Sequence, residues 1–166
     1  MMIRNLLVAS VFVVGLTVGL TSSPFADSAG ELKATTTTGA FNDINENVVD
    51  AILKRGFVID YHGFVGNMLK RTGKQLGSSV VYYKDNEFYQ FCSAQLTRTA
   101  VAVNLGNIGY CPYVVVVYEL ETAPGVIKVG YRPLPETDSA ASNKALGNIN
   151  KVLGAIVREA TKVVMN

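Results

Sequence analysis

The chain has 166 residues, 49% of them hydrophobic, and carries 15 lysine and arginine residues against 13 aspartate and glutamate residues. This length suits one domain with a substantial hydrophobic core. The near-neutral charge argues against nucleic acid or an anionic membrane as the main partner, because both require a basic excess concentrated on one face.

The amino terminus has the composition of a secretory signal. Arg4 precedes an apolar stretch over residues 6–20, and small polar residues lead to Ala26, after which we expect cleavage. The apolar stretch is shorter than the roughly 20 residues that cross a bilayer core. We therefore expect residues 1–26 to be removed, leaving a periplasmic or secreted protein without stable membrane insertion.

A change in pattern marks where the folded domain begins. Residues 27–40 are small and polar without periodicity, which predicts a flexible leader. Apolar residues then recur at helical spacing from Asn42, and Gly56 stands where a helix would stop. We expect a single domain over residues 41–166 that opens with this helix.

A strand and a second helix are expected next. Residues 57–61 alternate in the period-two pattern of a strand with one buried face. Residues 67–76 can form a short basic helix, in which Lys70 and Lys74 lie one turn apart. We expect these two lysines to share a solvent-exposed face.

The middle of the chain contains further β-favouring segments and a helix. Residues 80–83 and 88–91 flank a charged, turn-like segment, so they form either a hairpin or one interrupted strand. A helix follows, capped by Ser93 and ending near Asn104. Residues 105–109 contain two glycines, which predicts a flexible turn into the next strand.

The strongest predicted strand lies near the carboxyl end. Residues 114–118 are apolar on both faces, so this strand should be central and covered on both sides. A Pro-Gly turn joins it to a strand over residues 126–132, which gives an antiparallel hairpin. A long amphipathic helix follows over residues 138–164. Since little other apolar material is left, a second copy of the chain could cover the central strand, and we expect a homodimer.

The order of these elements predicts the fold class. Helix, strand, helix, one or two strands, helix, strand hairpin and long helix follow one another. This order is typical of an α+β domain. We expect a two-layer sandwich in which helices, including the long C-terminal one, cover one face of a small mixed sheet.

Several short segments occur in a distinctive order. They are Gly56-Phe57-Val58, Phe91-Cys92-Ser93-Ala94, Cys111-Pro112-Tyr113 with the strand through Glu119, Pro124-Gly125-Val126, and Gly130-Tyr131-Arg132-Pro133. Together they resemble the domain-of-unknown-function family 302 (DUF302) over roughly residues 41–160. The resemblance implies a compact α+β domain that often self-associates, occurs inside cells and in exported forms, and has no established activity. It also places both cysteines in the family's motif.

The chain has two cysteines, Cys92 and Cys111, and three interpretations of them stay open. A structural disulfide suits an exported protein with an even number of thiols. Parallel strands would separate the sulfurs by on the order of 15 Å of helical rise, whereas antiparallel strands would permit the Cα separation of within about 7 Å that a disulfide needs. Alternatively, both thiols pack as small hydrophobes. In the third interpretation Cys92, just before a helix, is a reactive thiol or soft ligand.

The only histidine, His62, stands at the end of a predicted strand. It could assist a cysteine as a base or ligand, but a surface or hydrogen-bonded histidine is the simpler interpretation. The sequence has no paired-cysteine metal spacing, phosphate-binding glycine loop or nucleophile elbow. We therefore assign no catalytic residue, metal or cofactor.

Two functional hypotheses follow, together with a structural one. The leading hypothesis is an exported, non-enzymatic domain that binds a small ligand or a protein partner. The alternative is a thiol-dependent redox or sulfur-carrier enzyme that uses Cys92, Cys111 or both, with His62 assisting. A structural subunit of a larger assembly is the third.

Overall fold

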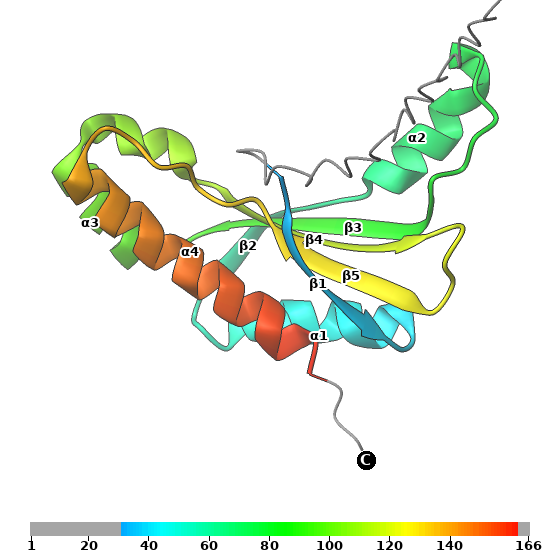
Figure 1. The fold of residues 1–166 in the computed structure, drawn as a ribbon, viewed down its shortest axis with the longest axis horizontal. Helices are drawn as coiled ribbons and strands as arrows, with labels where there is room; N and C mark the ends of the chain where they lie inside the picture. The colour runs from blue at the N-terminus through cyan, green and yellow to red at the C-terminus, as the bar shows by residue number, and fades with distance from the viewer. Residues whose placement is uncertain (1–30, 163–166) are drawn as a thin grey trace, which may run out of the picture.

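The computed structural model of the protein describes residues 31–162, so the predicted signal peptide lies outside the described residues. No helix in this part is long and apolar enough to cross a membrane. Figure 1 shows how the helices and strands follow one another along the chain. In chain order they are β1 (Lys33–Thr38), α1 (Phe41–Leu53), β2 (Val58–Gly63), α2 (Val65–Gly73), the 3-10 helix η1 (Lys74–Leu76), β3 (Tyr83–Cys92), α3 (Ala94–Val103), the 3-10 helix η2 (Leu105–Tyr110), β4 (Tyr113–Leu120), β5 (Val126–Tyr131) and α4 (Ala140–Ala160).

The five strands form one sheet in the order β1-β5-β4-β3-β2. β4 is central, as its apolar sequence predicts, and β4 and β5 form the expected hairpin. All four pairs of neighbouring strands are antiparallel, where we expected a mixed sheet. The reason lies between β3 and β4: the chain leaves the sheet as α3 and comes back through η2, so β4 starts beside the end of β3 and runs the other way.

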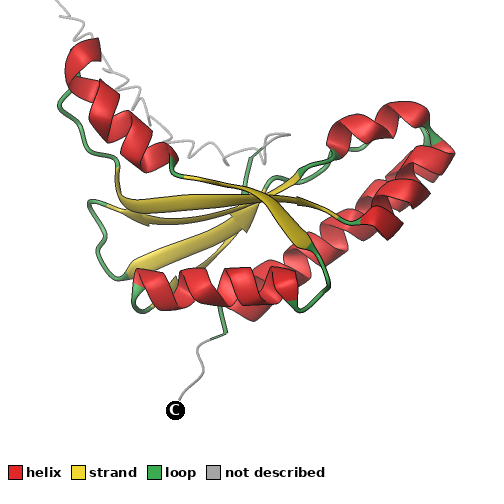
Figure 2. Cartoon of the chain, turned by 180° about the vertical axis from the view of Figure 1, so that it is seen from behind, coloured by secondary structure: helices red, strands yellow, loops and turns green. Residues whose placement is uncertain are grey.

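α1 and α4 cover one face of this sheet (Figures 1 and 2). Both helices are amphipathic, and most residues that the sequence placed on their apolar stripes are buried here, although Leu53 at the end of α1 is 50% exposed. The innermost side chains come from both helices and from alternate positions of the central strands, including Val48, Ile52, Val115, Val117, Ile127, Val129, Ile149 and Leu153. The predicted α+β fold, with helices on one face and a long C-terminal helix, is confirmed.

The opposite face of the sheet, the open face, is only partly covered by this chain. Phe88 of β3 pairs with Val116 of β4, and Tyr118 pairs with Lys128 of β5. These four side chains are half-buried, whereas Val115 and Val117 on the helix side are fully buried. The central strand is therefore fully covered on one face only.

The predicted flexible leader is wrong for residues 33–38, which form the edge strand β1. This strand pairs with β5 from Lys33 beside Tyr131 to Thr38 beside Val126. Its β-branched threonines favour extended backbone. Thr37 is its one buried side chain, and the sequence of the strand does not alternate between polar and apolar residues. The strand therefore lacks the period-two pattern by which a strand is predicted from sequence.

Of the two β-favouring segments around residues 84–87, only the second and the last residue of the first lie in a strand: β3 runs continuously from Tyr83 to Cys92, with an irregularity between Tyr83 and Asp85, and residues 80–82 lie outside it. The charged residues that the sequence assigned to a turn have partners on the neighbouring strands. Lys84 contacts Glu119 of β4, and Glu87 contacts His62 of β2. Charged side chains with partners on neighbouring strands can lie in a strand, so they need not mark a turn.

The predicted flexible turn at residues 105–109 is instead part of the 3-10 helix η2. Buried Asn107 holds it in place, because its amide Nδ2 donates to the carbonyl oxygen of Ala100 at 2.9 Å and to Ser142 Oγ at 3.1 Å. These bonds tie η2 to α3 and α4. The segment between β3 and β4 is therefore ordered and supports one wall of the cavity described next.

Candidate functional site

The structure brings the two cysteines together at one end of the sheet. Cys92 ends β3, and Cys111 lies just before β4, with the neighbouring residues Phe91 and Tyr113 directly paired. The Cα atoms of the cysteines are 5.8 Å apart, which is disulfide distance. Of the arrangements open from the sequence, the antiparallel one is found, and it is the one that permits a bond.

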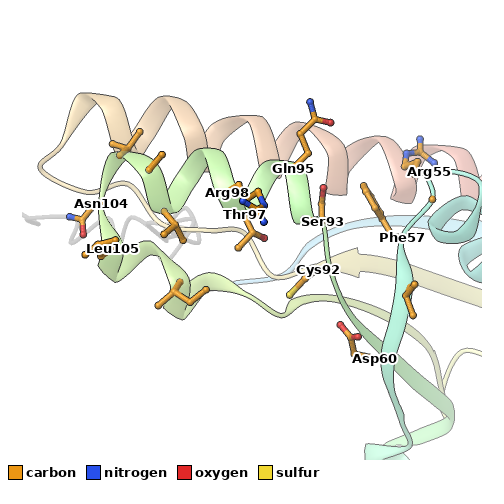
Figure 3. A pocket seen from close by; sticks show the side chains of 17 residues that line it. Arg55, Phe57, Asp60, Cys92, Ser93, Gln95, Thr97, Arg98, Asn104 and Leu105 are labelled. Atoms are coloured by element: carbon orange, nitrogen blue, oxygen red, sulfur yellow. The ribbon is translucent and has the colours of Figure 1, made fainter.

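A groove of about 1130 Å³ lies beside this cysteine pair, between α3, η2 and the start of β2. Figure 3 shows Cys92 and Asp60 on its sheet side, Thr97 and Arg98 on α3, and Leu105 beyond the end of that helix. We call it the α3 groove. Cys92 thus lines an open cavity and is not enclosed in the core.

The walls of the α3 groove are mostly apolar. The apolar lining includes Phe57 and Val58 at the sheet end and Val103, Leu105 and Ile108 at the far end. All of these except Phe57 are exposed to solvent. Exposed apolar side chains gathered around a concave surface are typical of a ligand site.

Three local contacts hold the groove in shape. Ser93 caps α3, its Oγ accepting a hydrogen bond from the Leu96 backbone N–H. The ring of Phe57 stacks on Phe91 with centroids 5.6 Å apart. The hydroxyls of Thr97 and Tyr113 lie 2.9 Å apart and link α3 to β4, and burial raises the pKa of Tyr113 above its usual value.

Of the two arginines that line the groove, one forms an ion pair and the other does not. Arg55 Nη1 lies 2.8 Å from Glu159 Oε2 of α4. Arg98 is exposed on α3 and enters no ion pair with the residues that the structure describes. Asp60 is the acidic residue of the lining, and it forms no ion pair with Arg98. Among the described residues, the Arg98 guanidinium therefore lies without an ion-pair partner beside apolar walls.

His62 is not part of this site. In the register of β2 and β3, Cys92 pairs with Val58, whereas His62 pairs with Tyr89. Four residues of strand therefore separate the imidazole from the cysteine position, or about 13 Å. The structure joins Cys92 with Cys111 and does not bring His62 to them.

His62 belongs to a polar cluster that sequence reasoning missed. Glu87 Oε2 lies 2.6 Å from His62 Nε2, accepts from the Asn45 amide at 2.8 Å, and lies 2.9 Å from the Tyr89 hydroxyl. Burial and the hydrogen bond to Glu87 raise the pKa of Tyr89 well above its usual value, so it remains a donor. No sequence pattern links these residues, because they come from α1, β2 and β3.

This cluster connects α1, β2 and β3 and is a poor candidate for a catalytic site. A carboxylate oxygen that already has three hydrogen-bonding partners is poorly placed to take a proton from a substrate. The His62 side chain is 39% exposed and stacks on the ring of Tyr89, with centroids 4.6 Å apart. In the described part of the chain, no group of three or more histidine, cysteine, aspartate or glutamate residues could hold a metal ion.

Comparison with solved structures identifies a similar fold. The crystal structure of an uncharacterised conserved protein of DUF302 from Bacillus stearothermophilus matches with a TM-score of 0.64 and 17% sequence identity, over 79% of this chain and 98% of that chain. No family model matches the sequence, and no curated protein does. At this identity the likeness shows the fold alone. The chain therefore has the fold of that DUF302 protein, in agreement with the resemblance noted in its sequence.

Proposed function

We propose that this protein is an exported, non-enzymatic binding domain whose ligand is a small amphipathic anion held in the α3 groove. The observation that carries the proposal is the combination, in one open cavity, of exposed apolar walls with Arg98, which has no ion-pair partner among the described residues. Apolar walls with a few well-placed polar groups are typical of ligand sites, and the volume suits a metabolite-sized molecule. An anionic end would pair with the guanidinium while an apolar body covers Val58 and Ile108.

The arrangement of the candidate reactive groups supports binding over catalysis. Cys92 faces Cys111 at disulfide distance, which leaves neither as a ready nucleophile. His62 lies several residues away and is held by Glu87. A thiol and a base within hydrogen-bonding reach would be needed for nucleophilic catalysis.

Export is supported by two features of the chain. Residues 1–26 have the composition of a secretory signal. The cysteine pair suits a compartment in which disulfides persist. We infer a periplasmic or secreted location from these features together.

The binding proposal can be tested with anilinonaphthalene sulfonate, an apolar anion whose fluorescence rises on binding. Arg98→Gln should weaken its binding by about tenfold, because a charge-assisted contact is lost. Ile108→Ser should weaken it by a few-fold through loss of apolar contact. Both side chains are exposed, so the fold should be unchanged.

Lys144→Gln is the matched control, since it removes the same charge from the exposed surface of α4. Its affinity for the probe should equal that of the unmodified chain. Equal affinity in all four proteins would show that the probe binds elsewhere and would refute the groove as the site. Laurate should displace the probe if the site accepts amphipathic carboxylates.

A thiol-dependent redox role is the second candidate, and the position of Cys92 favours it. Cys92 lines the open groove one residue before the Ser93 cap of α3, and a helix amino terminus stabilises a thiolate. A thiolate of a thiol-bearing partner would attack Cys92 Sγ, form a mixed disulfide and release Cys111 as a thiolate. A second partner thiolate would then attack the partner's sulfur in the mixed disulfide and release Cys92 as a thiolate, so that the partner ends as a disulfide and both cysteines end reduced.

We also propose that the protein is a homodimer that covers the open face of the sheet. The support is that Phe88, Val116 and Tyr118 are only half-buried there, although they lie on two inner strands, β3 and β4, of a sheet whose other face is covered by helices. Sedimentation velocity at micromolar concentration should give the mass of two chains. A monomer under these conditions would contradict the proposal.

A further inference from the structure

One part of the molecule stands away from the body. Residues 64–82, which we call the arm, comprise α2, η1 and the segment that leads into β3. The arm rises from the end of the sheet farthest from α3 (Figures 1 and 2). None of the residues in α2 or η1 is buried.

The arm is rich in exposed apolar side chains. At its far end Leu76 has 80% of its surface exposed. The other exposed apolar residues of the arm are Phe64, Val65, Met68, Leu69, Val80, Val81 and Tyr82. The surfaces of soluble proteins seldom carry so many large apolar side chains in one region, and such regions are typical of binding surfaces.

The arm is also cationic. It carries Lys70, Arg71 and Lys74, and the sequence has no acidic residue from Tyr61 to Lys84. At 100° per residue, Val65, Met68 and Leu69 fall on one side of α2 and these three cations on the other. An apolar side opposed to a lysine- and arginine-rich side is the arrangement of helices that lie at a lipid interface.

The arm is fixed to the body at its base. The backbone N–H of Gly66 donates to Asn86 Oδ1 of β3 at 3.1 Å. A Cβ on Gly66 would lie only 3.1 Å from Asn86 Cβ, so glycine permits the close approach of α2 to the strand. The far end of the arm, with Leu76, is thereby presented outward from the sheet.

We propose that the arm docks this protein on the surface of an anionic lipid bilayer. The apolar side chains would enter the interface while the three cations contact the lipid headgroups, without spanning the membrane. A projecting helix with an exposed apolar tip and an adjacent row of cations fits a planar anionic surface. The near-neutral charge of the whole chain does not oppose this, because the arm itself carries three cations and no acidic residue.

The test uses tryptophan fluorescence, since the chain contains no tryptophan. Leu76→Trp places the only indole at the tip of the arm. Its emission should shift to shorter wavelength with vesicles of phosphatidylglycerol and phosphatidylcholine, and much less with phosphatidylcholine alone. Raising the salt to about 0.5 M should reduce the shift, because surface charge is then screened.

A matched reporter excludes other contacts with the vesicle. Leu53→Trp replaces a residue of the same type that is 50% exposed at the end of α1, outside both the arm and the α3 groove. Its emission should not shift. Because residues 1–30 are identical in both proteins, any membrane contact that they make affects both reporters' binding equally. Equal shifts at the two positions, or no shift at Leu76→Trp, would overturn the proposal.

A charge test completes the experiment. Lys70→Gln, Arg71→Gln and Lys74→Gln together, in the Leu76→Trp background, should weaken vesicle binding by at least about tenfold. Lys144→Gln, Lys151→Gln and Lys162→Gln remove three charges from α4 and the residues after it, away from the arm. They should weaken binding by less than about threefold. Equal losses in both triple variants would mean that only net charge matters, and the arm would not be the docking surface.

Discussion

Replacing Cys92 and Cys111 together by alanine is expected to lower the free energy of unfolding by about 3 kcal/mol. The two cysteines are 19 positions apart, so a bond between them closes a loop that includes α3 and η2. A bond across such a loop restricts the unfolded chain and joins the ends of β3 and β4. Chemical denaturation of the oxidised protein and of the double variant measures the difference.

Reduction of the unmodified protein provides the control and separates the two functional hypotheses. A reductant should lower the denaturation midpoint of the unmodified chain and leave the double variant unchanged. A disulfide that only stabilises the fold should resist glutathione and have a reduction potential below about −300 mV. The disulfide of a redox carrier should have a reduction potential near about −200 mV. An unchanged midpoint after reduction would show that the cysteine pair contributes nothing to stability.

The parts of the fold that the sequence predicts well are those whose burial leaves a periodic pattern. Ile44, Val48 and Ile52 in α1 and Leu146, Ile149 and Leu153 in α4 recur at helical spacing, and all are buried. The valines of β4 are apolar on both faces, which places this strand at the centre of the sheet. These patterns reflect local geometry, so they can be detected without knowing which elements are neighbours.

The parts that failed depend on contacts between distant residues. The strand β1 is held by pairing with β5, and its exposed threonines carry no alternation. Lys84 and Glu87 resemble turn residues until their partners on β4, β2 and α1 are known. Pairing of a polar side chain across strands leaves no local pattern, so composition alone assigns such a segment to a turn.

The candidate site divides in the same way. The sequence singles out Cys92 and Cys111 by their rarity, but only the antiparallel register of β3 and β4 decides that they meet. The α3 groove draws on segments on both sides of the cysteine, and Arg98 attracts no notice in the sequence. Its importance depends on its lack of an ion-pair partner among the described residues, which is a property of the folded surface.

Glu119 is a buried acid whose carboxylate is held by two hydrogen bonds. Its side chain on β4 is only 2% exposed, and its Oε1 accepts hydrogen bonds from Lys84 Nζ at 2.9 Å and from the backbone N–H of Gly125 at 2.7 Å. The hydrogen bond from Lys84, followed by that from Gly125, holds the pKa of Glu119 below its usual value of 4.5. The carboxylate therefore joins β3 to the turn between β4 and β5.

Because the pKa of Glu119 is lower in the folded protein than in the unfolded chain, its contribution to stability is complete above the unfolded value and is lost as the pH falls through the folded one. Glu119→Gln keeps the size of the side chain and removes the charge. At pH 7 this variant should lose about 2 kcal/mol of unfolding free energy, the scale of a hydrogen bond to a charged group. As the pH falls from 7 to about 3, the difference from the unmodified protein should narrow.

Glu121→Gln is the control, since this nearby carboxylate is exposed, and its effect should stay within about 0.5 kcal/mol. Denaturant unfolding of the three proteins at several pH values supplies the measurement. If the difference in unfolding free energy between Glu119→Gln and the unmodified chain stays constant with pH, the loss of stability comes from the shape of the glutamine amide and not from the loss of charge. A difference that narrows toward low pH would mean that the turn between β4 and β5 is held by charge, and that its attachment to β3 weakens wherever the protein meets acid.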